Sequence, residues 1–327
     1  MKDNFRWGVI GTGGIAKQFA KDLRNTSNQR VVAVGSRSIA KAENFAKEIS
    51  ATPFGSYDEL VHSDVDAIYV ATPHSAHAEN AILAMRAKKP VLVEKPFAVS
   101  AKEARLMIEV SEQNQVPLME AMWSRFLPHY QIVREAISTG EIGEIVAIYA
   151  DHGQALPADP YYRLHAPELA GGALLDLGIY PISLTHLILG NPDEIIAAAD
   201  FTSSGVDSNT SMIFTYINGA HALLNTTLLI RTPTTATIVG ARGKIEIFGS
   251  FYSPTSLRIT NGNFSKDFPN EYHGHGLREQ AIEFEEIVRG KKLESPLMTH
   301  KSSLEIMEIM DEVRKQIGLR YPFESAL

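Results

Sequence analysis

The amino-acid sequence predicts an α/β domain followed by an α+β domain. In the first third of the chain, short apolar runs alternate with segments of helical period, which is typical of a doubly wound parallel sheet. Beyond that point, long alternating runs follow one another without helices between them, which predicts a mostly antiparallel sheet with helices on one face. Because 327 residues exceed the usual size of one hydrophobic core, we expect two domains, residues 1–122 and 123–327.

The first domain is expected to contain five strands separated by amphipathic helices. The five apolar runs are residues 7–10, 31–35, 67–71, 91–94 and 116–120. Ser38 and Ser100 are typical helix N-caps, so we expect helices over residues 39–49 and 101–114. Glu103 lies three residues after Ser100, which completes the pattern of a capping box.

The second domain is expected to contain seven strands and several helices. The strands are predicted at residues 144–151, 194–201, 208–217, 221–230, 234–239, 244–248 and 256–260. The helices are predicted at residues 128–138, 172–189, 277–289 and 299–317.

Composition excludes several kinds of chemistry. The chain has no cysteine, which rules out disulfides, a thiolate nucleophile and cysteine-ligated metal centres. The net charge of −7 opposes binding to nucleic acid or to an anionic membrane surface. We see neither a secretory signal pattern nor an apolar run of spanning length, so we expect a cytoplasmic protein without membrane or nucleic-acid partners. His273-Gly-His275 lacks a third ligand at a telling spacing, so we expect no metal.

A glycine-rich turn follows the first strand and opens a helix. Its sequence is Gly11-Thr12-Gly13-Gly14-Ile15-Ala16, in the context that a dinucleotide fingerprint requires. Gly11 permits the tight turn, and Gly13 lets the backbone approach a pyrophosphate. The helix N-terminus presents free N–H groups to the phosphates. The sequence therefore predicts a Rossmann domain that binds a dinucleotide.

The end of the second strand favours NADP over NAD. NAD sites usually place an acidic residue there for the ribose hydroxyls, whereas this strand ends in Gly35-Ser36-Arg37, with Lys41 one helical turn later. A hydroxyl and two cations suit a 2′-phosphate, because guanidinium binds phosphate through paired hydrogen bonds. The alternative is that Arg37 and Lys41 are solvated surface charges, and NAD then remains a second choice.

Further motifs resemble one oxidoreductase family over nearly the whole chain. They are Thr72-Pro73-His74 with His77, the triplet Glu94-Lys95-Pro96, and the run from Gly171-Gly172 through Asp176 to Tyr180. Together with the glycine-rich turn they resemble the Gfo/Idh/MocA family. The run 119–126, joined with Tyr180, is similar to the branch of dihydrodiol dehydrogenases and NADP-dependent D-xylose dehydrogenases.

The resemblance carries further expectations. It implies an open mixed sheet in the second domain, which often supports a homodimer or homotetramer, and a cis Lys95–Pro96 peptide. It also implies a cofactor site lined by residues of two of these motifs and by one residue before the Gly171-Gly172 turn: Thr72, Pro73, His77, Glu94, Lys95 and Arg163.

Lys95 and Tyr180 are the expected proton-handling pair. A lysine at the end of a parallel strand lies at the carboxyl edge of the sheet, where ligands bind in open α/β folds. Tyrosine is a weak base near neutral pH, and a nearby ammonium lowers its pKa. We expect Tyr180 to accept the hydroxyl proton while Lys95 stabilises the developing oxyanion.

Asp176 lies four residues before Tyr180, on the same face if the segment is helical, and Pro181 favours a kink there. Alternatively, Asp176 forms a local cap or ion pair and Tyr180 belongs to the core.

The substrate class follows from the resemblance: a sugar, a polyol or a trans-diol, oxidised or formed by reduction. Trp123 is either an apolar wall for the substrate or a packing residue at the domain junction. The rival hypothesis is a catalytically weak, nucleotide-sensing regulatory protein on the same scaffold. Retention of both Lys95 and Tyr180 argues for the enzyme.

Overall fold

The computed structural model describes residues 4–26, 28–157, 159 and 162–326. The chain forms two compact units. The first comprises the chain up to Phe126 together with Gly274–Leu304, and the second comprises Leu127–His273 and the chain from Glu305 onward. The sequence pattern places the boundary at 122/123, four residues earlier, and does not anticipate the return of residues 274–304 to the first unit. An apolar helix face shows that a helix packs on a core, but not on which core.

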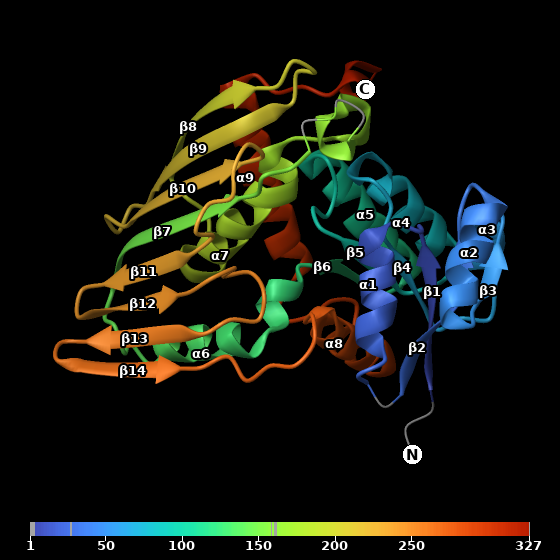
Figure 1. Ribbon diagram of the computed structural model, residues 1–327, viewed down its shortest axis with the longest axis horizontal. Helices are drawn as coiled ribbons and strands as arrows, with labels where there is room; N and C mark the ends of the chain where they lie inside the picture. The colour runs from blue at the N-terminus through green and yellow to red at the C-terminus, as the bar shows by residue number, and fades with distance from the viewer. Residues whose placement is uncertain (1–3, 27, 158, 160–161, 327) are drawn as a thin grey trace. The chain divides into compact units, whose positions relative to one another are not determined.

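The first unit is built on a six-stranded parallel sheet (Figure 1) with the order β3-β2-β1-β4-β5-β6. The strands are β1 (Phe5–Ile10), β2 (Gln29–Gly35), β3 (Thr52–Phe54), β4 (Ala67–Val70), β5 (Val91–Glu94) and β6 (Leu118–Ala121). The helices are α1 (Gly14–Leu23), α2 (Ile39–Ile49), α3 (Tyr57–Val61), α4 (His77–Arg86), α5 (Ala101–Asn114) and α8 (Leu277–Arg289). This order confirms the predicted Rossmann topology. The strands are all parallel, but the side of the sheet to which successive strands are added changes between β1 and β4.

This switch point in the strand order determines where ligands bind. In doubly wound sheets the crevice opens at the carboxyl ends of the strands on either side of the switch point. Gly11 follows β1, Ser36 follows β2, Thr72 lies two residues after β4 and Lys95 follows β5. The fold therefore gathers four of the predicted motifs at one edge of the sheet.

The second unit contains an open eight-stranded sheet with the order β14-β13-β12-β11-β7-β10-β9-β8 (Figure 1). Its strands are β7 (Ile145–Gly153), β8 (Glu194–Phe201), β9 (Asp207–Thr215), β10 (His221–Thr227), β11 (Ala236–Gly240), β12 (Gly243–Ile247), β13 (Leu257–Asn261) and β14 (Phe264–Phe268). The β7–β10 pair is parallel and the other pairs are antiparallel, so the sheet is mixed and mostly antiparallel, as expected.

The helices of the second unit pack on the inner face of this sheet. They are α6 (Pro128–Ser138) and α7 (Ile179–Leu189), while α9 (His300–Ile317) runs from the first unit into the second. Helix α7 contacts β7 and β10. The run Pro167–Leu189 is long and apolar enough to cross a membrane by length and composition, but 83% of its 18-residue apolar window is buried within the protein, as is usual for a core helix.

Two short strands escaped the sequence analysis. β3 has three residues, one of them Pro53, which is too short for an alternation signal. β14 pairs with β13 through a two-residue loop at Gly262, whose φ is +57°. The loop dipeptide Gly262-Asn263 is a hairpin signal and would have identified β14.

Candidate active site

The glycine-rich turn of the first unit has the geometry that a pyrophosphate needs. Gly11 has a φ of +114°, and a Cβ there would lie 2.5 Å from the Ala71 carbonyl oxygen. A side chain at Gly13 or Gly14 would instead meet open space. Helix α1 begins at Gly14 without a capping side chain and without an acidic residue in its first turn. Its N–H groups are therefore available to an anion. Thr12 and Ile15, in the same turn, are partly exposed.

The end of β2 retains the features that favour a 2′-phosphate. Arg37 and Lys41 are exposed, and no ion pair is assigned to either within the described part of the chain. Ser36 is buried and its Oγ accepts the N–H of Ser38 at 3.2 Å. Ser38 occupies the N-cap position of α2, but its side chain makes no capping hydrogen bond there, contrary to expectation. Ser100 does cap α5, by accepting the N–H of Glu103 at 3.3 Å.

Lys95 lies in a turn whose backbone is fixed by buried side chains. The Lys95–Pro96 peptide is cis, as expected. His77 is 1% exposed, with Nδ1 2.8 Å from the Pro96 carbonyl oxygen and Nε2 3.0 Å from that of Thr72. Burial, helped by His74 and Lys95, lowers the pKa of His77 to about 3, so the ring is neutral and has one N–H to donate. The His77 ring thus lies between the Thr72 and Pro96 carbonyl oxygens and can donate its one N–H to either of them.

Glu94 ends β5 with its carboxylate inside the unit. It accepts a hydrogen bond from the hydroxyl of Tyr69 on β4 and is 5% exposed. Tyr69 in turn stacks on Phe19 of α1, with ring centroids 4.0 Å apart. The hydrogen bond between Tyr69 and Glu94 therefore joins β4 to β5 directly before Lys95.

In the second unit, the Gly171-Gly172 turn makes room for a buried carboxylate. Gly172 has a φ of +114°, and a Cβ there would lie 2.1 Å from Asp207 Oδ1. Asp207 Oδ2 accepts the N–H of Leu174 at 2.7 Å and the hydroxyl of Thr210 at 2.8 Å. Asp207 thus caps the long apolar helical run, and burial raises its pKa to about 6. Asp207 was not among the residues predicted from the sequence.

The kink expected at Pro181 is displaced. Tyr180 and Pro181 belong to the first turn of α7, which continues directly from a π-helical turn at Leu174–Gly178, so the irregularity precedes the proline. Because Pro181 cannot bond the Leu177 carbonyl four residues back, that oxygen is available to another donor. His152 Nδ1 lies 3.2 Å from it.

The side chains of Asp176 and Tyr180 are both buried, the first in an ion pair and the second among aromatic rings. Asp176 Oδ1 accepts a hydrogen bond of 3.1 Å from Arg163, the residue expected at the nicotinamide end of the cofactor. This is the local ion pair that the alternative interpretation of Asp176 anticipated. The Tyr180 ring stacks on Tyr252, with centroids 4.3 Å apart, and lies 5.4 Å from the His152 ring.

His152 and Tyr252 are two further residues that were not predicted to belong to the site. Gln154 donates from Nε2 to His152 Nε2 at 3.0 Å, and the Leu177 carbonyl faces Nδ1, so the neutral ring carries its proton on Nδ1. Burial raises the pKa of Tyr252, and Asp176 adds to the rise. Alternation along β7, which buries Ile148, Ala150 and His152, would have placed His152 on the inner face. No local pattern marks Tyr252, which lies between strands.

Trp123 is mostly a packing residue. It is 4% exposed and stacks on His275, with ring centroids 5.0 Å apart. Asp22 holds this segment by accepting the backbone N–H groups of His275 and Gly276, both at 3.0 Å. The imidazole of His275 is thus an aromatic partner of Trp123.

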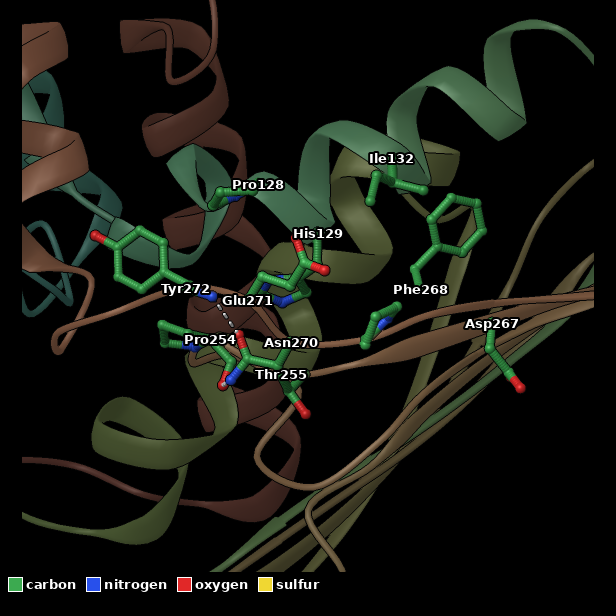
Figure 2. Close-up of a pocket in the computed structure, with 11 residues that line it drawn as sticks. Pro128, His129, Ile132, Pro254, Thr255, Asp267, Phe268, Asn270, Glu271 and Tyr272 are labelled. Atoms are coloured by element: carbon green, nitrogen blue, oxygen red, sulfur yellow. Dashed lines mark hydrogen bonds between the residues drawn. The ribbon is translucent and has the colours of Figure 1, made fainter.

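A separate cavity of about 410 Å³ lies in the second unit beside α6 (Figure 2). Its walls are three prolines, two aromatic rings and a group of polar side chains: Pro128, His129, Ile132, Pro254, Thr255, Asp267, Phe268, Pro269, Asn270, Glu271 and Tyr272. None of the residues predicted to bind cofactor or substrate lines it.

The amino-acid sequence matches known relatives over almost its whole length. A D-xylose 1-dehydrogenase (NADP(+)) from Hypocrea jecorina is 37% identical, covering 97% of this chain and 93% of that protein. A trans-1,2-dihydrobenzene-1,2-diol dehydrogenase from Xenopus laevis is 35% identical, covering 97% of this chain and 99% of that protein. A solved 3-ketoreductase from Actinomadura kijaniata, in complex with NADP and TDP-benzene, superposes with a TM-score of 0.86 at 26% identity, covering 96% and 98% of the two chains.

Two family signatures cover the two parts of the chain. Residues 5–122 match the oxidoreductase family with an NAD-binding Rossmann fold, and residues 130–246 match the GFO/IDH/MocA C-terminal domain. These matches confirm the resemblance that the motifs indicated. The chain belongs to the Gfo/Idh/MocA oxidoreductase family.

Proposed function

We propose that this protein is an NADP-dependent oxidoreductase that transfers a hydride between the nicotinamide and a hydroxyl or carbonyl carbon of a sugar, a polyol or a trans-diol. The observation that carries the proposal is the setting of Tyr180. Its ring is held by Tyr252 and His152 on the helix that also carries Asp176. A phenol fixed in this way can exchange a proton with a substrate hydroxyl.

The first unit supplies the cofactor site. The open N-terminus of α1 binds the pyrophosphate, and Ser36, Arg37 and Lys41 bind the 2′-phosphate. NADP(H) supplies or accepts the hydride. Thr72 and Pro73 line the nicotinamide ribose, and the His77 ring lies between their segment and the Lys95 turn.

Lys95 and Tyr180 handle the proton. In the oxidation direction Tyr180 accepts the hydroxyl proton, and the Lys95 ammonium stabilises the oxyanion that forms as the hydride leaves. In the reduction direction Tyr180 returns the proton to the carbonyl oxygen. Asp176, anchored by Arg163, orients the substrate hydroxyls from the same helix. Trp123, which stacks on His275, forms an apolar wall of the substrate site in this proposal.

The substrate class follows from both the site and the relatives. Tyr252 and Gln154 present hydroxyl and amide groups beside the rings of Tyr180 and His152, which suits a compound with several hydroxyls. The names of the relatives specify D-xylose and a dihydrobenzene diol. We place the protein in the cytoplasm. A chain without cysteine forms no disulfides and therefore does not need an oxidising compartment.

We further propose that the protein forms a homodimer through the outer face of the eight-stranded sheet. A homotetramer would contain two such dimers. Four exposed apolar side chains from four adjacent strands lie in one cross-strand row: Tyr149, Leu223, Ile213 and Ile196. Each is between 40% and 51% exposed. Such a row is typical of a surface that another copy of the chain covers.

The test is a titration followed by a substrate screen. Protein fluorescence is titrated with NADPH and NADH, and absorbance then follows turnover of pentoses, hexoses, diols and dicarbonyls in both redox states. We expect tighter binding of NADPH and turnover of one substrate class. Tight binding without turnover of any class would favour the nucleotide-sensing alternative.

Matched variants test the catalytic roles. Tyr180→Phe and Lys95→Met should lower kcat by at least about a hundredfold, the usual range for acid–base groups. Tyr216→Phe is the control, because Tyr216 is buried in the same unit and its hydroxyl has no hydrogen-bond partner within the described residues. Wild-type turnover in Tyr180→Phe would contradict the mechanism.

A further inference from the structure

Glu120 is a buried carboxylate to which the proposed mechanism gives no part. It lies on β6 opposite Val93 of β5 and is 1% exposed. Its Oε1 accepts a hydrogen bond of 3.0 Å from the backbone N–H of Phe97. Its Oε2 has no hydrogen-bond partner among the described residues. A buried carboxylate with one oxygen unsatisfied weakens the folded state, because the ion loses its solvation.

The N–H that Glu120 accepts belongs to the turn that carries Lys95. Phe97 is two residues beyond Lys95, and its side chain is fully buried. Pro96 lies between these two residues, and its carbonyl oxygen is 2.8 Å from Nδ1 of the His77 imidazole. The turn is therefore contacted at two consecutive residues, by an imidazole at Pro96 and by a carboxylate at Phe97.

We infer that Glu120 is a positioning residue for Lys95, whose ionised carboxylate fixes the Phe97 N–H and thereby the direction of the Lys95 ammonium. The inference rests on the proposed role of Lys95. An ionised carboxylate is a stronger acceptor than a carboxylic acid or an amide, so the turn is held most firmly when Glu120 carries its charge.

The groups around Glu120 set the pH at which this hold is lost. Burial raises the pKa of Glu120 to about 7, and Glu94 on β5 adds to the rise. The Ser303 hydroxyl of α9, the Arg125 guanidinium and the Phe97 N–H oppose it. Glu120 is therefore ionised above about pH 7 and protonated below it, so kcat should fall as the pH drops through this value.

The experiment compares Glu120→Gln with Glu285→Gln. Glu285 is a buried carboxylate of α8 in the same unit, bonded to Gln29 and to Arg289, so its variant controls for loss of a buried charge. Initial rates are measured from pH 5.5 to 9, together with the Kd of NADPH and the thermal midpoint. For Glu120→Gln we expect kcat at pH 8 to fall about tenfold or more, since small displacements of a catalytic group have effects of this order.

Three further readouts separate positioning from a merely structural role. In Glu120→Gln the fall of kcat below pH 7 should disappear, KM and the Kd of NADPH should change less than kcat, and the thermal midpoint at pH 8 should rise. Glu120→Asp keeps the charge but withdraws it by one methylene, so it should lower kcat and keep the fall below pH 7. Wild-type kcat in both variants, or a pH profile unchanged in Glu120→Gln, would overturn the inference.

The variant Lys95→Met separates a failure of the proposed function from a failure of the proposed role of Glu120. If Lys95→Met loses activity while Glu120→Gln behaves like Glu285→Gln, the proposed function stands and the role of Glu120 is wrong. If Lys95→Met keeps its full kcat, the proposed role of Lys95 fails, and the inference about Glu120 fails with it.

Discussion

Replacement of Gly172 by alanine should destabilise the second unit strongly, for two separable reasons. The backbone at Gly172 has a φ of +114°, which costs a residue with a side chain about 1–3 kcal/mol. A Cβ there would also lie 2.1 Å from Asp207 Oδ1, so the carboxylate must move. Its displacement weakens the hydrogen bonds from Leu174 and Thr210, each worth about 1.5–3 kcal/mol to a charged acceptor. We therefore expect a loss of about 4 kcal/mol.

The matched control is Gly219→Ala. Gly219 has a φ of +84°, but a Cβ there meets no atom within 4 Å, so this variant carries the backbone cost without the clash. Urea unfolding should be followed by far-UV circular dichroism, because both tryptophans, Trp7 and Trp123, belong to the first unit. Equal losses in the two glycine variants would refute the reasoning. The double variant Gly172→Ala/Asp207→Ala should lose less than the sum of its parts, because the clash is then gone.

Three further outcomes follow from the structure. Arg37→Ala should weaken NADPH by about tenfold while leaving NADH nearly unchanged, and equal weakening in fluorescence titrations would remove the 2′-phosphate from the role of Arg37. Glu120→Gln should equal the wild type in stability below about pH 4.5 and exceed it by about 3 kcal/mol above pH 7, because a pKa raised from 4.5 to about 7 means that the folded protein loses stability as the pH rises through this window. Leu223→Lys should shift the protein toward monomer in sedimentation velocity, whereas an unchanged sedimentation coefficient would contradict the proposed interface.

Local signals predicted the helices well. Helices α2, α5, α6 and α8 begin and end at the residues that capping and periodicity indicated. Their ends are set by neighbours within four residues, which the sequence displays directly. The membership of α8 in the first unit was not predictable, because it depends on Gln29 and Asn28, which lie more than 250 residues away and bond to Glu285.

The same distinction applies to the candidate site. Gly11, Ser36, Thr72 and Lys95 were predictable as a group because each follows a parallel strand, and the topology alone brings such positions to one edge. Asp207 is different, because its partner Leu174 is 33 residues away. A single aspartate at the start of a strand carries no local sign that it caps a distant helix.

Glu120 in the first unit and Asp207 in the second are buried carboxylates in similar surroundings. Each is a carboxylate almost without exposure, each accepts a backbone N–H of a segment that carries a proposed catalytic residue, and each has one oxygen without a partner in the described structure. Burial raises the pKa of Glu120 to about 7 and that of Asp207 to about 6, so ionisation of each costs the fold about 3 kcal/mol. An apolar or amide side chain would avoid this cost but would hold the N–H less firmly. The presence of both carboxylates is therefore better explained by the need to fix Lys95 and the Tyr180 helix than by stability, and the two should respond alike: Asp207→Asn, like Glu120→Gln, should lower kcat although the thermal midpoint at pH 8 rises.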